Sequence, residues 1–365
     1  MAFLKIGFIG LGLIGGSIAK AIRQYFPDYE LLAFDKSKET LALAVQEGTI
    51  HTSCSSIDDN FRDCSYIFLC APVTYNTAYL TQLKDLIQPE CILTDVGSVK
   101  TSIHEEIVRL GMEDNFIGGH PMAGSEKSGF VNSKAMLIEN AYYILTPSAT
   151  VSDDKIKKYR ELVDHLKALP MILNYKEHDY VTGTISHLPH IIASSLVNFV
   201  RDTDNGDELM KTLAAGGFKD ITRIASSSPV MWQQICLKNK QNISRILEQY
   251  IETLQNAKGL IDQGAEKDLY AMFESSKDYR DSMPDSSAGP IKKRFAIYCD
   301  IIDEAGGIAT IATILASNHI NIKNIGIIHN REFEEGVLRI EFYEEESSLK
   351  AATLLQKFHY IVYEV

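Results

Sequence analysis

Short apolar runs alternate with amphipathic stretches through the first half of the chain. The apolar runs begin near residues 3, 31, 66, 91, 115, 141 and 171, and stretches with helical spacing of apolar residues lie between them. This alternation of buried strands and helices is typical of an α/β fold with a doubly wound parallel sheet. We therefore predict one such domain over residues 1–174.

The pattern changes near residue 175, where the strand-like runs stop. Apolar residues recur at helical spacing over residues 190–200 and 230–263, which predicts an all-helical domain over residues 175–280. Residues 281–293 include a stretch rich in Ser, Pro, Gly and Asp, which indicates a linker. Residues 294–365 then alternate as strand, helix, strand, strand, helix and strand, an order that predicts a ferredoxin-like (βαββαβ) domain.

Three glycines follow the first apolar run. Gly10, Gly12 and Gly15 fill the G-x-G-x-x-G pattern, and Asp35 ends the next run about 20 residues further on. This arrangement predicts a dinucleotide-binding Rossmann domain whose carboxylate holds a ribose, which favours NAD over NADP. Lys36 and Lys38 weaken that preference. The candidate cofactor-binding residues are Gly10, Leu11, Gly12, Leu13, Ile14, Gly15, Asp35, Ala71, Pro72, Gly97 and Ser98.

Charge and cysteine content narrow the class of protein. Asp and Glu number 48 against 36 Lys and Arg, a net charge of −12, which argues against binding to nucleic acid or to an anionic membrane. The six cysteines show no C-x-x-C spacing, so we predict reduced thiols in a cytoplasmic protein and no metal site. No apolar run is long enough to span a membrane.

A dinucleotide domain followed by a helical domain indicates hydride transfer, which needs a neutral base beside the substrate hydroxyl. Among ten histidines, His120 stands out because it ends a predicted strand and precedes a glycine-rich loop that contains Glu126. A buried structural histidine is the alternative. The remaining histidines outside the segment 186–190 are expected at the surface; they are His51, His104, His165, His178, His319, His329 and His359.

Two further segments carry candidate substrate contacts. Pro189 suits the first turn of a helix, so His187 and His190 are expected at a helix start, and a zinc site there is disfavoured. Arg223 can clamp a carboxylate with Asp220 holding its guanidinium, although a solvated helix pair is equally compatible with the spacing. Gly216 begins this second segment and Trp232 follows it.

Five blocks in the same order resemble the prephenate dehydrogenase family of tyrosine biosynthesis. They are residues 10–17, 95–100, 119–129, 186–190 and 217–223. The resemblance implies NAD-dependent oxidative decarboxylation of prephenate to 4-hydroxyphenylpyruvate. His120 would accept the hydroxyl proton, and Ser98 would bond that hydroxyl and align the nicotinamide.

The same resemblance assigns the substrate contacts. Arg223 would bind a carboxylate, His190 and His187 would contact the substrate, and Glu126 would shape the entrance. Family members dimerise through the helical domain, where Trp232 would approach the partner's site.

Residues 294–365 resemble an ACT domain, a module that binds amino acids. Asp303, Ala305 and Gly306 occupy its first loop, and Asn321 and Ile322 begin its second strand. Ala305 stands where the family usually has proline. The resemblance implies feedback inhibition by tyrosine.

Three other functions remain open. Arogenate dehydrogenase uses the same chemistry on the amino-acid analogue of prephenate. A dehydrogenase of small hydroxy acids shares the build but needs neither Arg223 nor the amino-acid module. A non-catalytic sensor that holds NAD structurally is disfavoured by the presence of His120, Ser98 and Arg223 together.

Overall fold

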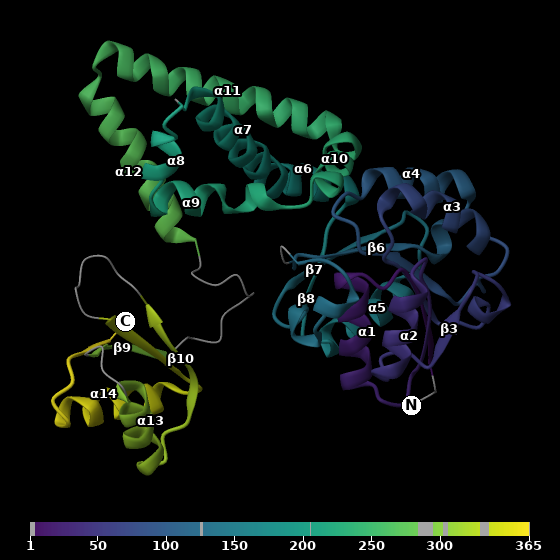
Figure 1. Cartoon of the computed structure of the whole chain (residues 1–365). Helices are drawn as coiled ribbons and strands as arrows, with labels where there is room; N and C mark the ends of the chain where they lie inside the picture. Colours follow the sequence, from purple (N-terminus) through teal and green to yellow (C-terminus); the bar gives the residue numbers. More distant parts are fainter. Residues whose placement is uncertain are drawn as a thin grey trace. The chain divides into compact units, whose positions relative to one another are not determined.

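The computed structural model describes residues 4–124, 127–204, 206–283, 295–301, 306–328 and 336–364. The chain divides into two compact units, residues 1–289 and residues 290–365 (Figure 1).

The first unit is built on a five-stranded parallel sheet with the order β3-β2-β1-β4-β5. The strands are β1 (Lys5–Ile9), β2 (Glu30–Phe34), β3 (Thr52–Cys54), β4 (Tyr66–Leu69) and β5 (Ile92–Asp95). Every residue of β4 and β5 is buried, as expected for strands covered on both faces. The predicted α/β fold with a parallel sheet is confirmed.

Helices cover both faces of this sheet because alternate strand residues point to opposite sides. Phe8 and Phe68 face one apolar core with α1 (Leu13–Tyr25), α2 (Lys38–Gln46) and α5 (Asp153–His165). Ile9 and Ile67 face a second core with α3 (Val73–Leu83) and α4 (Thr101–Leu110). Because helices cover both faces of the sheet, the carboxyl ends of the strands remain available for a ligand-binding site.

The predicted strands near residues 115, 141 and 171 depart from the parallel order. They are β6 (Ile117–Pro121), β7 (Tyr142–Pro147) and β8 (Leu169–Ile172), and they form a smaller sheet in which β7 runs antiparallel to β6. The described residues between β6 and β7 form only short 3₁₀ turns, and no crossover helix among them returns the chain in parallel. A parallel bridge from Leu93 to Phe116 joins β6 to the edge of β5.

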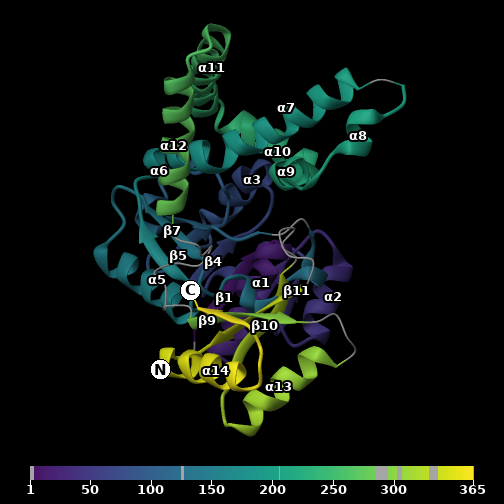
Figure 2. The same ribbon diagram turned by 90° about the vertical axis from the view of Figure 1, so that its left-hand side faces the viewer.

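The helical region of the first unit follows β8 and is drawn in teal and green in Figures 1 and 2. Its helices are α6 (Tyr175–Thr182), α7 (Leu188–Thr203), α8 (Leu209–Leu213), α9 (Gly216–Thr222), α10 (Pro229–Lys238), α11 (Lys240–Gln263) and α12 (Glu266–Ser282). The long helix predicted over residues 230–263 is wrong in one respect, because it breaks at Asn239 into α10 and α11.

Pro189 lies in the first turn of α7, as predicted, but α7 does not begin as a free helix end. Helix α6 continues into α7 through a π turn, Gly183–His187, so Pro189 lies inside one long helical rod. A π turn shifts the hydrogen-bond register, and it thereby accommodates the missing N–H of a proline just after it.

The second unit confirms the ferredoxin-like prediction. Its elements are β9 (Phe295–Ile301), α13 (Gly307–Ser317), β10 (Ile322–Ile328), β11 (Gly336–Phe342), α14 (Glu345–Lys357) and β12 (Val362–Glu364). The four strands pair antiparallel in the order β10-β11-β9-β12. Both helices contribute to one apolar core through Ile311, Leu315 and Leu355.

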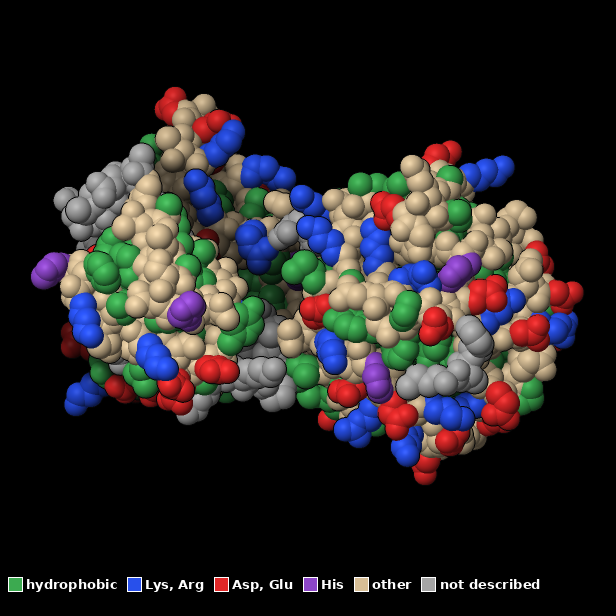
Figure 3. All heavy atoms as spheres, turned by 90° about the horizontal axis from the view of Figure 1, so that it is seen from below, with side chains coloured by type: hydrophobic (Ala, Val, Ile, Leu, Met, Phe, Trp, Pro, Cys, Tyr) green, Lys and Arg blue, Asp and Glu red, His purple; other side chains and the backbone are tan. Residues whose placement is uncertain are grey.

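The surface carries both signs of charge. Acidic and basic side chains intermingle over the face shown in Figure 3. Among the residues that the structure describes, no helix is both long and apolar enough to cross a bilayer.

Candidate functional site

The glycine turn between β1 and α1 leaves room for a ligand at one position and packs tightly at two others. Gly10 has a φ of +98°, and a Cβ there would lie 2.8 Å from the backbone nitrogen of Ala71. A Cβ on Gly15 would lie 2.6 Å from the carbonyl oxygen of Gly10. A Cβ on Gly12 would meet no atom within 4 Å, and no side chain caps the first turn of α1. This open helix start fits a pyrophosphate.

Asp35 lies at the end of β2, beside this turn. Its Oδ2 accepts the backbone N–H of Leu11 at 2.7 Å, and its Oδ1 accepts that of Ser37 at 2.8 Å. The carboxylate is therefore held in place while it stays partly exposed. The ammonium of Lys36 lies 3.6 Å from the ring centre of Tyr75.

A buried ion pair joins the ends of β5 and β6. Lys100 and Asp95 are 0% and 1% exposed, and the Lys100 ammonium bonds both Asp95 and the carbonyl oxygen of Gly119, the latter at 2.6 Å. Asp95 also accepts the backbone N–H groups of Gly97 at 2.9 Å and of Gly119 at 3.3 Å. Ser98 and His120 directly follow Gly97 and Gly119, so this pair fixes both residues at one edge of the sheet.

His120 is tied to the helical region through a second histidine. Its Nδ1 lies 2.8 Å from Nε2 of His178, and Nδ1 of His178 lies 2.8 Å from Oδ1 of Asp179. Asp179 accepts the backbone N–H groups of Lys100 and Thr101, each at 2.7 Å, which caps α4. Sequence reasoning missed His178 and Asp179, because both are polar and both are fully buried.

The surface prediction is therefore wrong for His178, and it is also wrong for His104. His104 is 3% exposed, stacks on Tyr175 and lies 3.0 Å from the hydroxyl of Thr146. It lies in the core because Gly118 leaves space beside it.

Burial determines the protonation of these groups. It lowers the pKa of His120 well below its usual value, and the nearby His178 and Lys100 lower it further. Burial alone would raise the pKa of Asp179, but hydrogen bonds from His178, Thr101 and Lys100 outweigh it and lower that pKa. At neutral pH the site therefore holds a neutral His120 and an ionised Asp179.

We expect the stability of the first unit to fall as the medium becomes acidic, partly through His104. Burial lowers the pKa of His104 from 6.5 to about 3, so below pH 6.5 only the unfolded chain binds this proton. Stability is complete above pH 6.5 and is lost as the pH falls towards 3, by about 2 kcal/mol between pH 7 and pH 5.

Denaturant unfolding of the wild type and of His104→Gln at several pH values checks this. In His104→Gln the free energy of unfolding should depend less steeply on pH than in the wild type. Replacing the exposed His165 with glutamine should leave that dependence unchanged. Equal slopes for the wild type and His104→Gln would contradict the assignment.

The predicted substrate histidines lie on the rod formed by α6 and α7. His187 Nδ1 accepts from the Asn239 side-chain amide at 3.1 Å, so its Nε2 carries the proton. That buried N–H has no hydrogen-bond partner among the described residues. His190 stacks on Trp232 with ring centres 3.6 Å apart, and its Nδ1 lies 3.0 Å from the carbonyl oxygen of Ser186.

The other candidate residues have less defined surroundings. Gly216 begins α9, while Asp220 and Arg223 are exposed in the single chain. Arg223 lies close enough to His190 to lower its pKa, although burial is the larger cause. Ala71 and Pro72 lie between β4 and α3, beside the glycine turn.

Some predicted positions fall elsewhere. Glu126, Asp303 and Ala305 lie outside the described residues. Gly306 caps α13 with a φ of +97°, Asn321 precedes β10 and Ile322 begins it. Within the described ranges, no group of three His, Cys, Asp or Glu residues could hold a metal ion.

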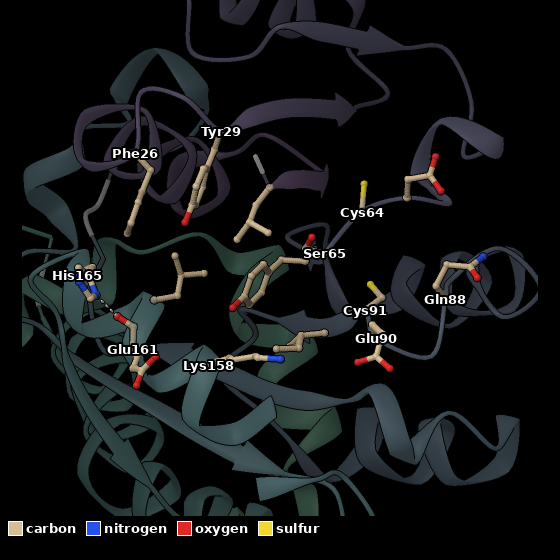
Figure 4. Close-up of a pocket in the computed structure, with 15 residues that line it drawn as sticks. Phe26, Tyr29, Cys64, Ser65, Gln88, Glu90, Cys91, Lys158, Glu161 and His165 are labelled. Carbon is tan, nitrogen blue, oxygen red and sulfur yellow. Dashed lines mark hydrogen bonds between the residues drawn. The ribbon is translucent and has the colours of Figure 1, made fainter. Parts of the chain in front are cut away.

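A pocket of about 570 Å³ lies at the opposite edge of the sheet (Figure 4). Leu4, Tyr66 and Ile92 line it from the amino ends of β1, β4 and β5, together with Tyr29 and His165. Ligands of open α/β sheets bind at the carboxyl ends of the strands, so this pocket is separate from the site built on Gly12 and His120.

A dinucleotide on the glycine turn would lie at the sheet edge that holds a neutral imidazole. Such an imidazole can take the proton of a hydroxyl as the attached carbon loses hydride. The fold and the site thus define a dehydrogenase that uses a nicotinamide dinucleotide.

Comparisons with known proteins agree with this class. The nucleotide-binding domain of prephenate dehydrogenase matches residues 18–171, and its dimerization domain matches residues 174–275. Prephenate dehydrogenase of Bacillus subtilis is 38% identical over 95% of this chain and 94% of its own length.

Two solved structures add to these matches. Prephenate dehydrogenase from A. aeolicus, in complex with hydroxyphenyl propionate and NAD+, is 31% identical, with a TM-score of 0.73 over 77% of this chain and 98% of that one. The ACT domain of prephenate dehydrogenase from Bacillus anthracis is 40% identical and covers 19% of this chain and 99% of that one, with a TM-score of 0.18.

The chain belongs to the prephenate dehydrogenase family. The predicted family and the predicted enzyme class, an NAD-dependent oxidoreductase, are confirmed.

Proposed function

We propose that the chain catalyses the NAD-dependent oxidative decarboxylation of prephenate to 4-hydroxyphenylpyruvate, with His120 as the base. The observation that carries this proposal is the partly buried, neutral His120 at the sheet edge that also carries the glycine turn. Loss of carbon dioxide and aromatisation of the ring drive the reaction, so the protein chiefly supplies positioning and one proton acceptor.

The residues of the glycine turn fit the cofactor. The open space at Gly12 and the uncapped start of α1 suit the pyrophosphate, and the fixed carboxylate of Asp35 suits a ribose. The bound nicotinamide supplies the hydride acceptor. Ala71, Pro72 and Gly97 line the same edge, and Ser98 hydrogen-bonds the substrate hydroxyl and helps to align the nicotinamide.

The substrate carries two carboxylates, so the site needs a cation and neutral donors. Arg223 supplies a guanidinium on the turn Arg223–Ser226, which packs against α7, the helix that carries His190. The proton on Nε2 of His187 is a buried donor ready for a ligand oxygen. Asp220 and Gly216 place the arginine, and Glu126 shapes the entrance.

A homodimer completes the enzyme. The match to a dimerization domain supports this, and so do large apolar side chains that the single chain exposes on its helices. These include Phe199 on α7, Leu237 on α10 and Ile261 on α11, each at least 65% exposed. Trp232, which packs against His190, approaches the partner's site.

The second unit is an amino-acid-binding ACT domain through which tyrosine inhibits the enzyme. Its ferredoxin-like topology supports this role, with Gly306 at the start of α13 and Asn321 and Ile322 at the start of β10. Asp303 and Ala305 are proposed contacts of the same ligand.

We expect the purified enzyme to reduce NAD when prephenate is added and to slow down when tyrosine is added. The absorbance of reduced nicotinamide measures both effects, with arogenate and a small hydroxy acid as competing substrates. Turnover on arogenate alone would keep the chemistry and change the substrate. No reduction of NAD with any of these substrates would refute the proposal. Unchanged kinetics at saturating tyrosine would show that the second unit binds another ligand or none.

A further inference from the structure

We propose that His178 and Asp179 are positioning residues that fix the tautomer of His120, so that Nε2 is the atom that accepts the substrate proton. This inference rests on the proposed function, because it takes His120 to be the base. Neither residue was singled out by the sequence, and both lie on α6, the first helix after the nucleotide-binding region.

The argument starts at the carboxylate. Asp179 is fully buried and accepts two backbone N–H groups, from Lys100 and Thr101. A carboxylate with these donors stays ionised and can only accept hydrogen bonds. The 2.8 Å contact therefore requires that Nδ1 of His178 carries a proton and donates it to Asp179.

The direction of the next hydrogen bond follows from the first. A neutral imidazole has one donor nitrogen and one acceptor nitrogen, so Nε2 of His178 is the acceptor. It lies 2.8 Å from Nδ1 of His120, which must therefore hold the proton of that ring. Nε2 of His120 is then bare. It lies on the side of the ring away from the buried His178, and His120 as a whole stays partly exposed.

Burial keeps His120 neutral until a proton arrives, and the ammonium of Lys100 also opposes a positive charge on its ring. When Nε2 takes a proton, the hydrogen bond from Nδ1 strengthens and the negative charge of Asp179 acts through His178. Asp95 pairs with Lys100 and offsets its charge.

The same carboxylate caps α4, the helix that begins just after Ser98. Asp179 therefore positions both the segment that carries Ser98 and, through His178, the ring of His120. These hydrogen bonds connect the helical region to the nucleotide-binding region.

Nitrogen-15 NMR of histidine-labelled wild-type protein tests the tautomer without any turnover. We expect a His120 ring with protonated Nδ1 and bare Nε2, assigned by its loss in His120→Asn. A His120 ring protonated at Nε2, or an even mixture of tautomers, would overturn the proposal, whatever the substrate proves to be.

Kinetics of His178 variants supply the second test. In His178→Phe, which keeps the ring volume, we expect kcat to fall about 10- to 100-fold. KM for prephenate should change little, and the acidic limb of the kcat profile should shift. His178→Gln, whose side-chain oxygen can still accept from Nδ1 of His120, should recover part of the rate. His104→Gln changes a histidine that is also buried but lies outside the hydrogen-bonded chain of His120, His178 and Asp179. This variant should keep the wild-type dependence of kcat on pH.

The outcomes separate the two proposals. An unchanged kcat and pH profile in His178→Phe would refute the positioning role even if prephenate is the substrate. If no substrate turns over, or if His178→Phe fails to fold, the NMR of the wild type still decides the tautomer.

Discussion

Replacing His120 with asparagine should lower kcat by about 1,000-fold, within the range that general-base catalysis contributes. Asparagine retains a polar group near His178 but has no nitrogen that can take a proton at neutral pH. The absorbance of reduced nicotinamide under saturating prephenate and NAD measures the loss. Calorimetric titration should show that the variant still binds NAD, since the glycine turn and Asp35, the proposed cofactor contacts, are unchanged.

The pH dependence of the wild-type rate gives a second check on the role of His120. Because the pKa of His120 is lowered, its neutral form persists as the pH falls below 6.5, and the rate should drop only in more acidic solution. A rate that falls by less than about 10-fold in His120→Asn would show that another group or water accepts the proton.

Replacing Asp95 with alanine should destabilise the first unit by about 3–5 kcal/mol, because the change leaves the buried ammonium of Lys100 without its counter-ion. Asp95 also accepts two backbone N–H groups, so β5 and β6 lose several contacts at once. Thermal unfolding followed by circular dichroism measures the change as a lower Tm.

Asp262→Ala is a matched control for this experiment. It breaks an exposed ion pair with Lys258 on α11, and such pairs contribute about 0–1 kcal/mol. Equal melting temperatures for the two variants would contradict the view that the buried pair holds the sheet edge together. Restoring stability in the double variant Asp95→Leu with Lys100→Met would support it.

The parts of the fold that follow local rules could be predicted from the sequence. Alternating apolar runs identified the parallel strands, and the spacing of three glycines and an acid located the glycine turn. Gly10 and Gly15 are required there because a side chain would clash with nearby backbone, whereas Gly12 leaves open space. The strand Thr52–Cys54 was missed because only Cys54 is buried in it. The direction of β7 depends on the absence of a crossover helix, which no short pattern records.

The candidate site was predictable only in part for a related reason. His120 ends a strand and stands next to glycines, so its position was visible in the chain. The buried face of α6 consists of His178, Asp179 and Thr182, which are all polar. Periodicity of apolar residues cannot detect such a face. A histidine next to an aspartate in the helix that begins after the asparagine cap Asn174 is the one sequence signal that could have pointed to it.

The π turn between α6 and α7 sets the rotation about the helix axis between His178 on one side and His187 and His190 on the other. His178 lies before the turn, and His187 and His190 lie at its end and beyond it. The turn begins at Gly183, where a Cβ would lie 2.9 Å from the side chain of Ile246 on α11. The turn is therefore packed closely against that helix. Each residue in a helix rotates the following ones by about 100°. One inserted or deleted residue here would therefore rotate His187 and His190, the proposed substrate contacts, as a block about the helix axis while His178 and its contact with His120 stay in place.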